Sequence, residues 1–259
     1  MESASSDYRL MLGPRAESAE AYCALGVNAA IRSLADQAER AFRKAITLKP
    51  DYHWAHYCLG VVLSEAGRHS DAIAELETAV RGLPGNLRVA RALGKAWIAG
   101  GDGAQAIAIF KDALADNPNS AEASALHQEM AGAYYAEGRF SEASREFEMA
   151  IEARPRAPYL RVNLGASYLA QGDAERAAAQ FRKALEINPR LVSALRNLGT
   201  LHLKAGQIDD AITALETAVS VDPSHPITLR KLAFAYLEKG DKARAELSMR
   251  QAMEMEGRT

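Results

Sequence analysis

Apolar and polar residues recur along this chain with a period of 34 residues. The pattern is marked by prolines, which stand at Pro50, Pro84, Pro118, Pro155, Pro189 and Pro223. All but one of the steps between them is 34 residues, and the exception is 37. When each proline is given position 32 of a repeat, seven repeats begin at residues 19, 53, 87, 124, 158, 192 and 226. Such a period indicates a tandem array of one supersecondary unit.

Large and small residues alternate inside each repeat in a way that predicts a helical hairpin. Positions 7 and 24 carry large apolar residues, whereas position 8 is always glycine or alanine. Position 20 is alanine in every repeat: Ala38, Ala72, Ala106, Ala143, Ala177, Ala211 and Ala245. Position 27 is also alanine throughout: Ala45, Ala79, Ala113, Ala150, Ala184, Ala218 and Ala252. Large residues that face small ones let two antiparallel helices approach closely.

The ends of the two helices are predicted by glycine and proline. Position 15 is glycine in six repeats and Ser33 in the first. Glycine adopts a positive φ without a Cβ penalty, so the first helix should end there. Proline at position 32 should end the second helix and push the preceding residue out of the helical region. Ser141, Asp173 and Asp241 stand where the second helix needs a cap or an acidic first turn.

The pattern resembles the tetratricopeptide repeat (TPR) family over residues 19–259. Small residues at positions 8, 20 and 27, a bulky residue at 24 and proline at 32 are that family's signature. The resemblance implies an all-α fold, a right-handed superhelical solenoid of seven antiparallel helix-turn-helix hairpins. Residues 1–18 are expected to form a partly disordered leader that caps the first repeat. The pentatricopeptide family has a similar period and reads RNA, but alanine at 20 and 27 with proline at 32 favours the TPR family.

The resemblance also implies that the first helices line a concave groove, which they face with positions 2, 5, 6, 9 and 12. Positions 2, 5, 9 and 12 form one stripe on a helix. The stripe is aromatic and apolar in the first two repeats, basic in the third, and rich in amides and cations further on. We expect the peptide-binding groove to be lined by Trp54, Tyr57, Val61, Arg88, Arg91, Lys95, Gln128, Asn163, Arg196, Asn197, Arg230 and Lys231.

These residues predict an extended or helical partner segment with acidic character, because aromatic and arginine side chains dominate interfaces and the cations cluster. Asn163 and Asn197 share position 6, where an amide can pair with a peptide backbone, and resemble the asparagine ladder of O-linked sugar transferases. The two-carboxylate clamp that binds chaperone C-termini is not reproduced, since the repeat after Arg91 and Lys95 offers Glu129 at position 6. The alternatives are a solvated cationic face, and an aromatic pair packed against the first repeat or the leader.

Composition narrows the choice of partner and compartment. The chain has 31 Lys and Arg against 33 Asp and Glu, a net charge of −2 and a sequence pI near 6.3, which argues against nucleic acid as a partner. No uncharged stretch is long enough for a bilayer, and no secretory signal begins the chain. Two cysteines, Cys23 and Cys58, fit a reducing compartment. We expect a cytoplasmic protein without membrane insertion.

The sequence offers little that points to catalysis or metal binding. His53 and His56 lie near Cys58, a spacing that suggests a metal site. Position 4 normally packs inside the hairpin, however, so His56 is predicted to be a core residue that replaces the tryptophan frequent there in the family. The positions of the serines, cysteines, histidines and aspartates do not indicate a Ser/His/Asp triad or a Cys/His pair for nucleophilic catalysis. We therefore expect no enzyme activity, no cofactor and no metal.

The favoured function is a non-catalytic scaffold for protein–protein interaction, and two alternatives remain open. One is the partner-recruiting TPR region of a larger enzyme of the glycosyl- or sulfotransferase type. The other is a self-assembling scaffold. The last helix carries Met249 and Met253, and adaptable methionines on an end face are typical of contact surfaces. These residues predict a homo-oligomer formed through the C-terminal end.

Overall fold

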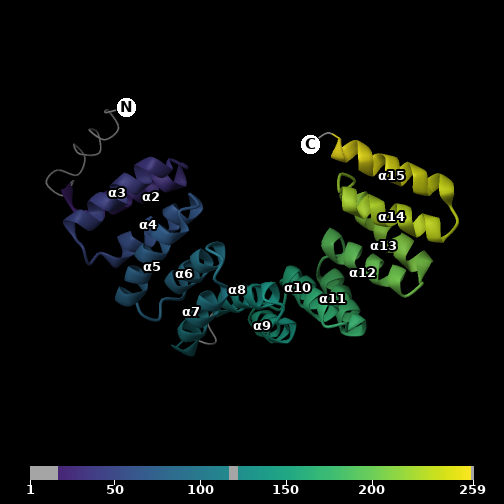
Figure 1. Cartoon of the computed structure of the whole chain (residues 1–259), viewed down its shortest axis with the longest axis horizontal. Coiled ribbons are helices and arrows are strands. Elements are labelled where there is room, and N and C mark those ends of the chain that lie inside the picture. The colour runs from purple at the N-terminus through teal and green to yellow at the C-terminus, as the bar shows by residue number, and fades with distance from the viewer. Residues whose placement is uncertain (1–16, 117–121, 258–259) are drawn as a thin grey trace. The chain divides into compact units, whose positions relative to one another are not determined.

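A computed structural model of the chain describes residues 17–116 and 122–257. Within these ranges every regular element is helical and the helices follow one another as hairpins (Figure 1). The first helices are α2 (Ala19–Ile31), α4 (His53–Glu65), α6 (Leu87–Ala99), α8 (Ala123–Ala136), α10 (Pro158–Ala170), α12 (Val192–Lys204) and α14 (Pro226–Glu238). The second helices are α3 (Ala35–Leu48), α5 (His69–Gly82), α7 (Gly103–Asp116), α9 (Phe140–Ala153), α11 (Ala174–Ile187), α13 (Ile208–Val221) and α15 (Lys242–Glu256). The all-α fold of tandem hairpins is confirmed.

The chain divides into two compact halves, residues 1–137 and 138–259. The division falls inside the fourth repeat, between its two helices. Within each half, each helix packs against the next along the chain, so that neighbouring hairpins lie side by side (Figure 1). The predicted cap in the leader lies outside the described residues, except that the Ser18 hydroxyl accepts a hydrogen bond from the Ala21 amide at 3.1 Å and caps α2.

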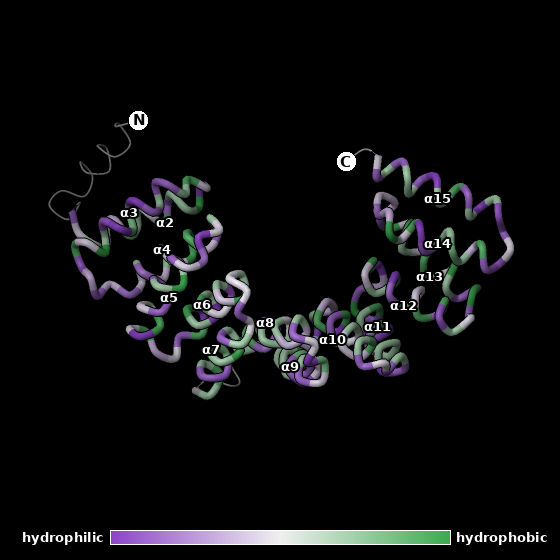
Figure 2. The backbone as a smooth tube through the Cα atoms, in the orientation of Figure 1, coloured by the Kyte–Doolittle hydropathy of each residue, from purple (hydrophilic) through white to green (hydrophobic). Residues whose placement is uncertain are grey.

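The size pattern of the repeat sets how closely the two helices of a hairpin pack. Along the helices hydrophilic and hydrophobic residues alternate, as the colours of Figure 2 show. The alanines at positions 20 and 27 are buried in every repeat. At position 8, a Cβ added to Gly165 would lie 2.5 Å from the ring of Phe181, which occupies position 24. Real Cβ atoms essentially never come this close, so the glycine is what allows the large residue to fill the hairpin.

The predicted ends of the helices are confirmed by the backbone. All six glycines at position 15 have φ between 71° and 91°, and Ser33 takes the same left-handed conformation with φ 57°. Among the described residues, Lys49, Asn188 and Asp222 stand before repeat prolines and are extended, with φ −144° at Lys49. Asp173 and Asp241 cap α11 and α15 through their side chains. Ser141 does not cap α9, because the helix begins at Phe140 and its N-cap is Arg139; Ser141 lies in the first turn instead.

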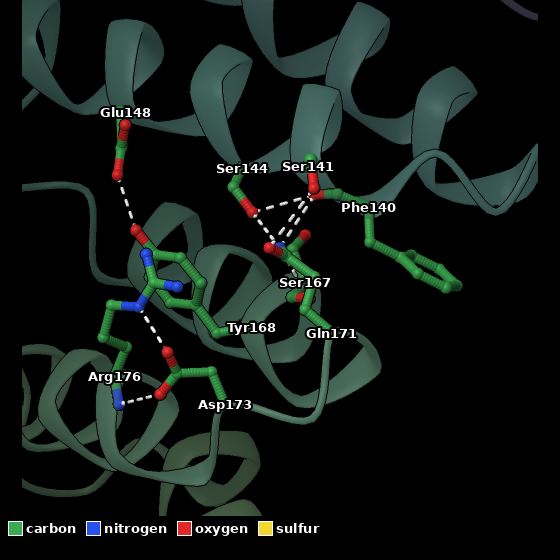
Figure 3. Close-up of polar contacts among 9 residues, drawn as sticks. All are labelled: Phe140, Ser141, Ser144, Glu148, Ser167, Tyr168, Gln171, Asp173 and Arg176. Carbon is green, nitrogen blue, oxygen red and sulfur yellow. Dashed lines mark hydrogen bonds and ion pairs between the residues drawn. The ribbon is translucent and has the colours of Figure 1, made fainter.

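A polar clasp joins the fourth and fifth repeats within the C-terminal half (Figure 3). Tyr168 on α10 donates a hydrogen bond to Glu148 on α9 at 2.5 Å. The Arg176 guanidinium lies 4.5 Å from the centre of the Tyr168 ring and is held by Asp173, also at 2.5 Å. Burial, and then the bond to Glu148, raise the pKa of Tyr168 to about 12. Beside it, the Gln171 amide donates to the Phe140 carbonyl at 3.0 Å.

The same clasp recurs two repeats later. Tyr236 donates to Glu216 of the preceding repeat, and Arg244 lies 4.6 Å from the Tyr236 ring while it pairs with Asp241. The clasp therefore follows a pattern in the repeat: tyrosine at position 11, aspartate at 16, arginine at 19 and glutamate at 25 of the repeat before. In both places it joins one hairpin to the next.

Candidate peptide-binding surface

The stripe predicted to bind a partner runs along the first helices of both halves. In the N-terminal half it lies on α2, α4, α6 and α8, and in the C-terminal half on α10, α12 and α14. Surface cavities open along this stripe in each half. Concave space and exposed side chains therefore coincide with positions 2, 5, 6 and 9 of the repeat. The two halves are described in turn.

In the N-terminal half, a cavity of about 440 Å³ opens between α4, α6 and α8. Five of the predicted groove residues line it: Tyr57, Val61, Arg88, Arg91 and Lys95. Leucines from α5, α6 and α8 add to its apolar wall. Burial raises the pKa of the Tyr57 hydroxyl, which keeps it in the neutral form that can donate a hydrogen bond to a ligand. The site has an apolar floor and a basic rim.

The basic rim is weaker than the sequence predicts, because two of its three cations are already paired. Arg91 donates two hydrogen bonds to one Glu129 oxygen, at 2.6 and 3.1 Å, and Arg88 reaches Glu122 at 3.4 Å. Lys95 has no ion pair within the described part of the chain. Glu129 lies in the fourth repeat and Glu122 just before it. Whether they neutralise the arginines of the third repeat therefore depends on how the hairpins stack. Lys95 is therefore the cation of this cavity that is open to a ligand.

The aromatic end of the stripe is a stacked pair. The rings of Trp54 and Tyr57 lie 4.9 Å apart at an angle of 28°, and Trp54 is 37% exposed. Trp54 also lines a cavity of about 380 Å³ with Cys23, Val27 and Tyr52. Tyr57 packs against the core cluster that includes Cys23 of the first repeat, while Trp54 faces the open cavity. Both rings can take part in an aromatic contact with a partner.

The histidine and cysteine cluster near α4 is occupied by protein partners. His56 is buried, with Nδ1 2.6 Å from Glu75 and Nε2 2.9 Å from the carbonyl oxygen of Pro50. Cys23 and Cys58 are free thiols that interact with each other, an interaction that lowers the pKa of Cys23 and raises that of Cys58. In the described ranges, no group of three side chains is arranged to hold a metal ion. His56 is a core residue with both ring nitrogens engaged.

In the C-terminal half, a cavity of about 570 Å³ opens between α12 and α14. It is lined by the predicted Arg230 and Lys231 and by residues that the sequence analysis did not select: Thr200, Leu203, Lys204, Ile227 and Phe234. Ile227 and Phe234 occupy positions 2 and 9 of the seventh repeat, so a complete reading of the stripe could have identified them. Lys204 stands at position 13, outside the stripe, and only the structure places it here.

Cations crowd this second cavity. Burial lowers the pKa of the Lys231 ammonium, and repulsion from Arg196 and Lys204 lowers it further. Arg196 contacts His225, with 2.6 Å between Nη1 and Nε2, and Arg230 pairs with Glu256. The described residues that line the cavity include no acid. Its positive charge is thus less compensated than that of the N-terminal cavity.

The three predicted amides lie outside these cavities. Asn163 is exposed on α10, Asn197 is half-buried on α12, and Gln128 is half-buried on α8. In the part of the chain that the structure describes, the side-chain amides of Asn163 and Asn197 make no hydrogen bond. They remain open to the backbone of a bound segment.

The end of the chain predicted to self-associate exposes apolar side chains. On α15, Met249 is 37% exposed and Met253 65%, so both face solvent. None of the described helices combines the length and the apolar character that a membrane crossing requires.

Comparisons with known proteins agree with this architecture. The family model described as the cilia and flagella-associated protein 70 C-terminal domain, a TPR model, matches residues 27–259. No curated protein sequence matches the chain significantly. The crystal structure of MamA is similar with a TM-score of 0.59 and 22% identity, over 64% of this chain and 95% of that one. These identities establish the fold.

Two other solved structures extend the comparison. The chain of the APC/C hetero-tetramer Cut9–Hcn1 is similar with a TM-score of 0.63 and 19% identity, over 89% of this chain and 45% of that one. The crystal structure of YrrB, described as a TPR protein with an unusual peptide-binding site, has a TM-score of 0.56 and 18% identity, over 70% of this chain and 91% of that one.

Proposed function

Because the chain belongs to the tetratricopeptide-repeat family described as the cilia and flagella-associated protein 70 C-terminal domain, we propose that it is a non-catalytic scaffold that binds a segment of another protein along its first helices. The observation that carries the proposal is the coincidence of cavities with the stripe positions in both halves. The peptide-binding site named for YrrB supports a role of this kind.

The bound segment is extended or helical and has acidic character. Lys95 in the N-terminal cavity, and Lys204 and Lys231 in the C-terminal one, are cations that a carboxylate can reach. Tyr57 lines the same cavity as Lys95, and Phe234 lines the same cavity as Lys204 and Lys231. Aromatic residues next to cations are typical of the residues that dominate binding energy. Acidic and apolar side chains in one segment would satisfy both kinds of contact.

The proposal is tested by selecting random displayed peptides on the purified chain and measuring their affinity for groove variants. We expect the selected peptides to be enriched in acidic and apolar residues, and to lose affinity for a Lys95→Glu/Lys231→Glu variant. A matched control, Arg182→Glu/Lys183→Glu, changes two exposed cations on the second helix α11. Equal binding of the peptides to wild type and to the groove variant would show that the first helices are not the binding surface.

A second candidate function is self-association through the C-terminal helix. It is favoured by the exposure of Met249 and Met253 on one face of α15, because exposed methionines one turn apart form an adaptable apolar surface. The partner in this case is a second copy of the chain. The proposal is tested at the scale of the whole molecule below.

A further inference from the structure

We propose that the cavity between α12 and α14 is a self-contained binding site for a short extended peptide in which acidic residues are flanked by large apolar ones. This inference rests on the proposed function, because it names what one part of the stripe recognises. It assigns the tightest recognition of acidic residues to the C-terminal half, whereas the sequence analysis placed the basic centre of the groove in the third repeat.

The first step is the charge of the cavity. Lys204 and Lys231 make no hydrogen bond or ion pair within the described residues, and Lys231 is repelled by both Lys204 and Arg196. Like charges held together in a partly buried site destabilise the free protein and are relieved when an anion binds. The clustering of these cations beside an open cavity is unfavourable in the free protein. A bound carboxylate would make it favourable.

The second step is the apolar surface that flanks the cations. Ile227 and Phe234 line the same cavity and are 54% and 51% exposed. They stand at i and i+7 on α14, while Arg230 and Lys231 stand between them, so one face of the helix reads apolar, basic, apolar. Large apolar residues at the edge of a charged site are typical of binding surfaces.

The third step is the length of this pattern. Seven residues of α-helix span roughly 10 Å. A peptide in the extended polyproline II conformation covers this length in about three residues, and its side chains three positions apart lie on the same side. Two apolar residues three positions apart, with two acidic residues between them, therefore match Ile227, the cations and Phe234. The N-terminal cavity offers a poorer match, since Glu122 and Glu129 already occupy Arg88 and Arg91.

The test uses the full chain and a fluorescent peptide that contains Leu-Asp-Asp-Leu, acetylated and amidated so that it has no terminal carboxylate. We expect it to bind about tenfold more tightly than the Leu-Asn-Asn-Leu peptide, and to lose affinity as salt is added. Lys231→Ala and Phe234→Ala should each weaken binding severalfold, whereas Lys231→Arg should retain it. Lys183→Ala, an exposed cation on α11, is the matched control and should leave the affinity unchanged.

Each contrary result has a distinct meaning. Equal affinity for the two peptides, or an equal loss with Lys183→Ala, overturns the site. If Lys95→Ala abolishes binding and Lys231→Ala does not, the proposed scaffold function stands and this inference fails. If neither variant changes the affinity, the first helices do not bind acidic segments and both proposals fail. Binding that appears only when the peptide has a free C-terminal carboxylate also overturns the internal acidic segment as the occupant.

Discussion

Single residues at position 8 of the repeat control how closely two helices pack. Gly165 faces the ring of Phe181, and a Cβ at that position would lie 2.5 Å from the ring. The phenylalanine is fully buried and has no room to withdraw. A single methyl group is therefore enough to disturb the hairpin, since overpacking a close-packed core forces strained rotamers or backbone shifts.

We predict that Gly165→Ala lowers the free energy of unfolding by about 1–3 kcal/mol. Gly132 is the matched control, because it lies in the helix α8 with no atom within 4 Å of the Cβ that alanine would add. Gly132→Ala should raise the free energy of unfolding by about 0.5–1 kcal/mol, as alanine is the better helix former. Urea unfolding followed by circular dichroism measures both. A neutral Gly165→Ala would mean that Phe181 can move aside.

Lys231 provides a second prediction at this scale, on the stability of the proposed binding site. Its pKa is lowered from 10.5 by burial, by Arg196 and by Lys204. The charged form of Lys231 therefore destabilises the folded protein at every pH below the folded-state pKa. The free energy of unfolding rises as the pH increases from this pKa towards 10.5, because Lys231 loses its proton in the folded state first. We predict that Lys231→Met raises Tm at neutral pH, and that added salt narrows the difference because it screens the repulsion.

The measurement is a series of thermal unfolding curves of wild type and Lys231→Met from neutral pH to above pH 10.5. The gain of the variant should shrink as the pH rises and Lys231 of the wild type loses its proton. Lys183→Met, on an exposed face of α11, should show no such trend. A lower Tm for Lys231→Met would contradict the repulsion on which the proposed site depends.

At the scale of the elements, the clasp joins one hairpin to the next. It links α9 to α10 through Glu148 and Tyr168, and α10 to α11 through Arg176 over the tyrosine ring (Figure 3). Three helices are thus held by one phenol.

We predict that Tyr168→Phe lowers the free energy of unfolding by about 1 kcal/mol, because it removes a hydrogen bond to a charged group that is partly exposed. The pKa of Tyr168 is raised to about 12, so its contribution is complete below pH 10 and is lost as the pH rises through 12. Tyr159→Phe on the same helix is the control, since the described residues form no hydrogen bond with its hydroxyl. Equal effects of the two changes on urea unfolding would contradict the clasp.

At the scale of the whole molecule, the question is whether the chain acts as a monomer or assembles. Met253 is 65% exposed at the face of α15 that also carries Met249. We predict that sedimentation equilibrium finds an apparent mass that rises with concentration, and that Met253→Glu abolishes the rise by placing a charge in the contact.

The control for this experiment is Met149→Glu, which places the same charge on α9, where the methionine is 41% exposed. It should leave the association unchanged. If wild type stays at 28.0 kDa at every concentration, or if Met149→Glu has the same effect, α15 is not a self-association surface.

The hairpins themselves could be predicted because the signals that define them are local. Glycine at position 15 and proline at 32 act on the φ and ψ of one or two residues, and Ser33 shows that the left-handed turn is kept even where glycine is missing. Alanine at positions 20 and 27 indicates that the two helices of the same repeat pack closely. Glycine at 15 and proline at 32 each recur in six repeats and the alanines in all seven, so the sequence alone determined the fold and the ends of the helices.

Only the tertiary structure decided the charge of the binding surface. Glu122 and Glu129 neutralise Arg88 and Arg91 from the neighbouring repeat, while Lys204 joins Lys231 from position 13 of the repeat before. Electrostatic interactions depend on distance through space, and the distances between repeats are set by how hairpins stack. A pattern read within one repeat contains no such distance, so it could select the cations of the stripe and still misjudge which of them were already paired.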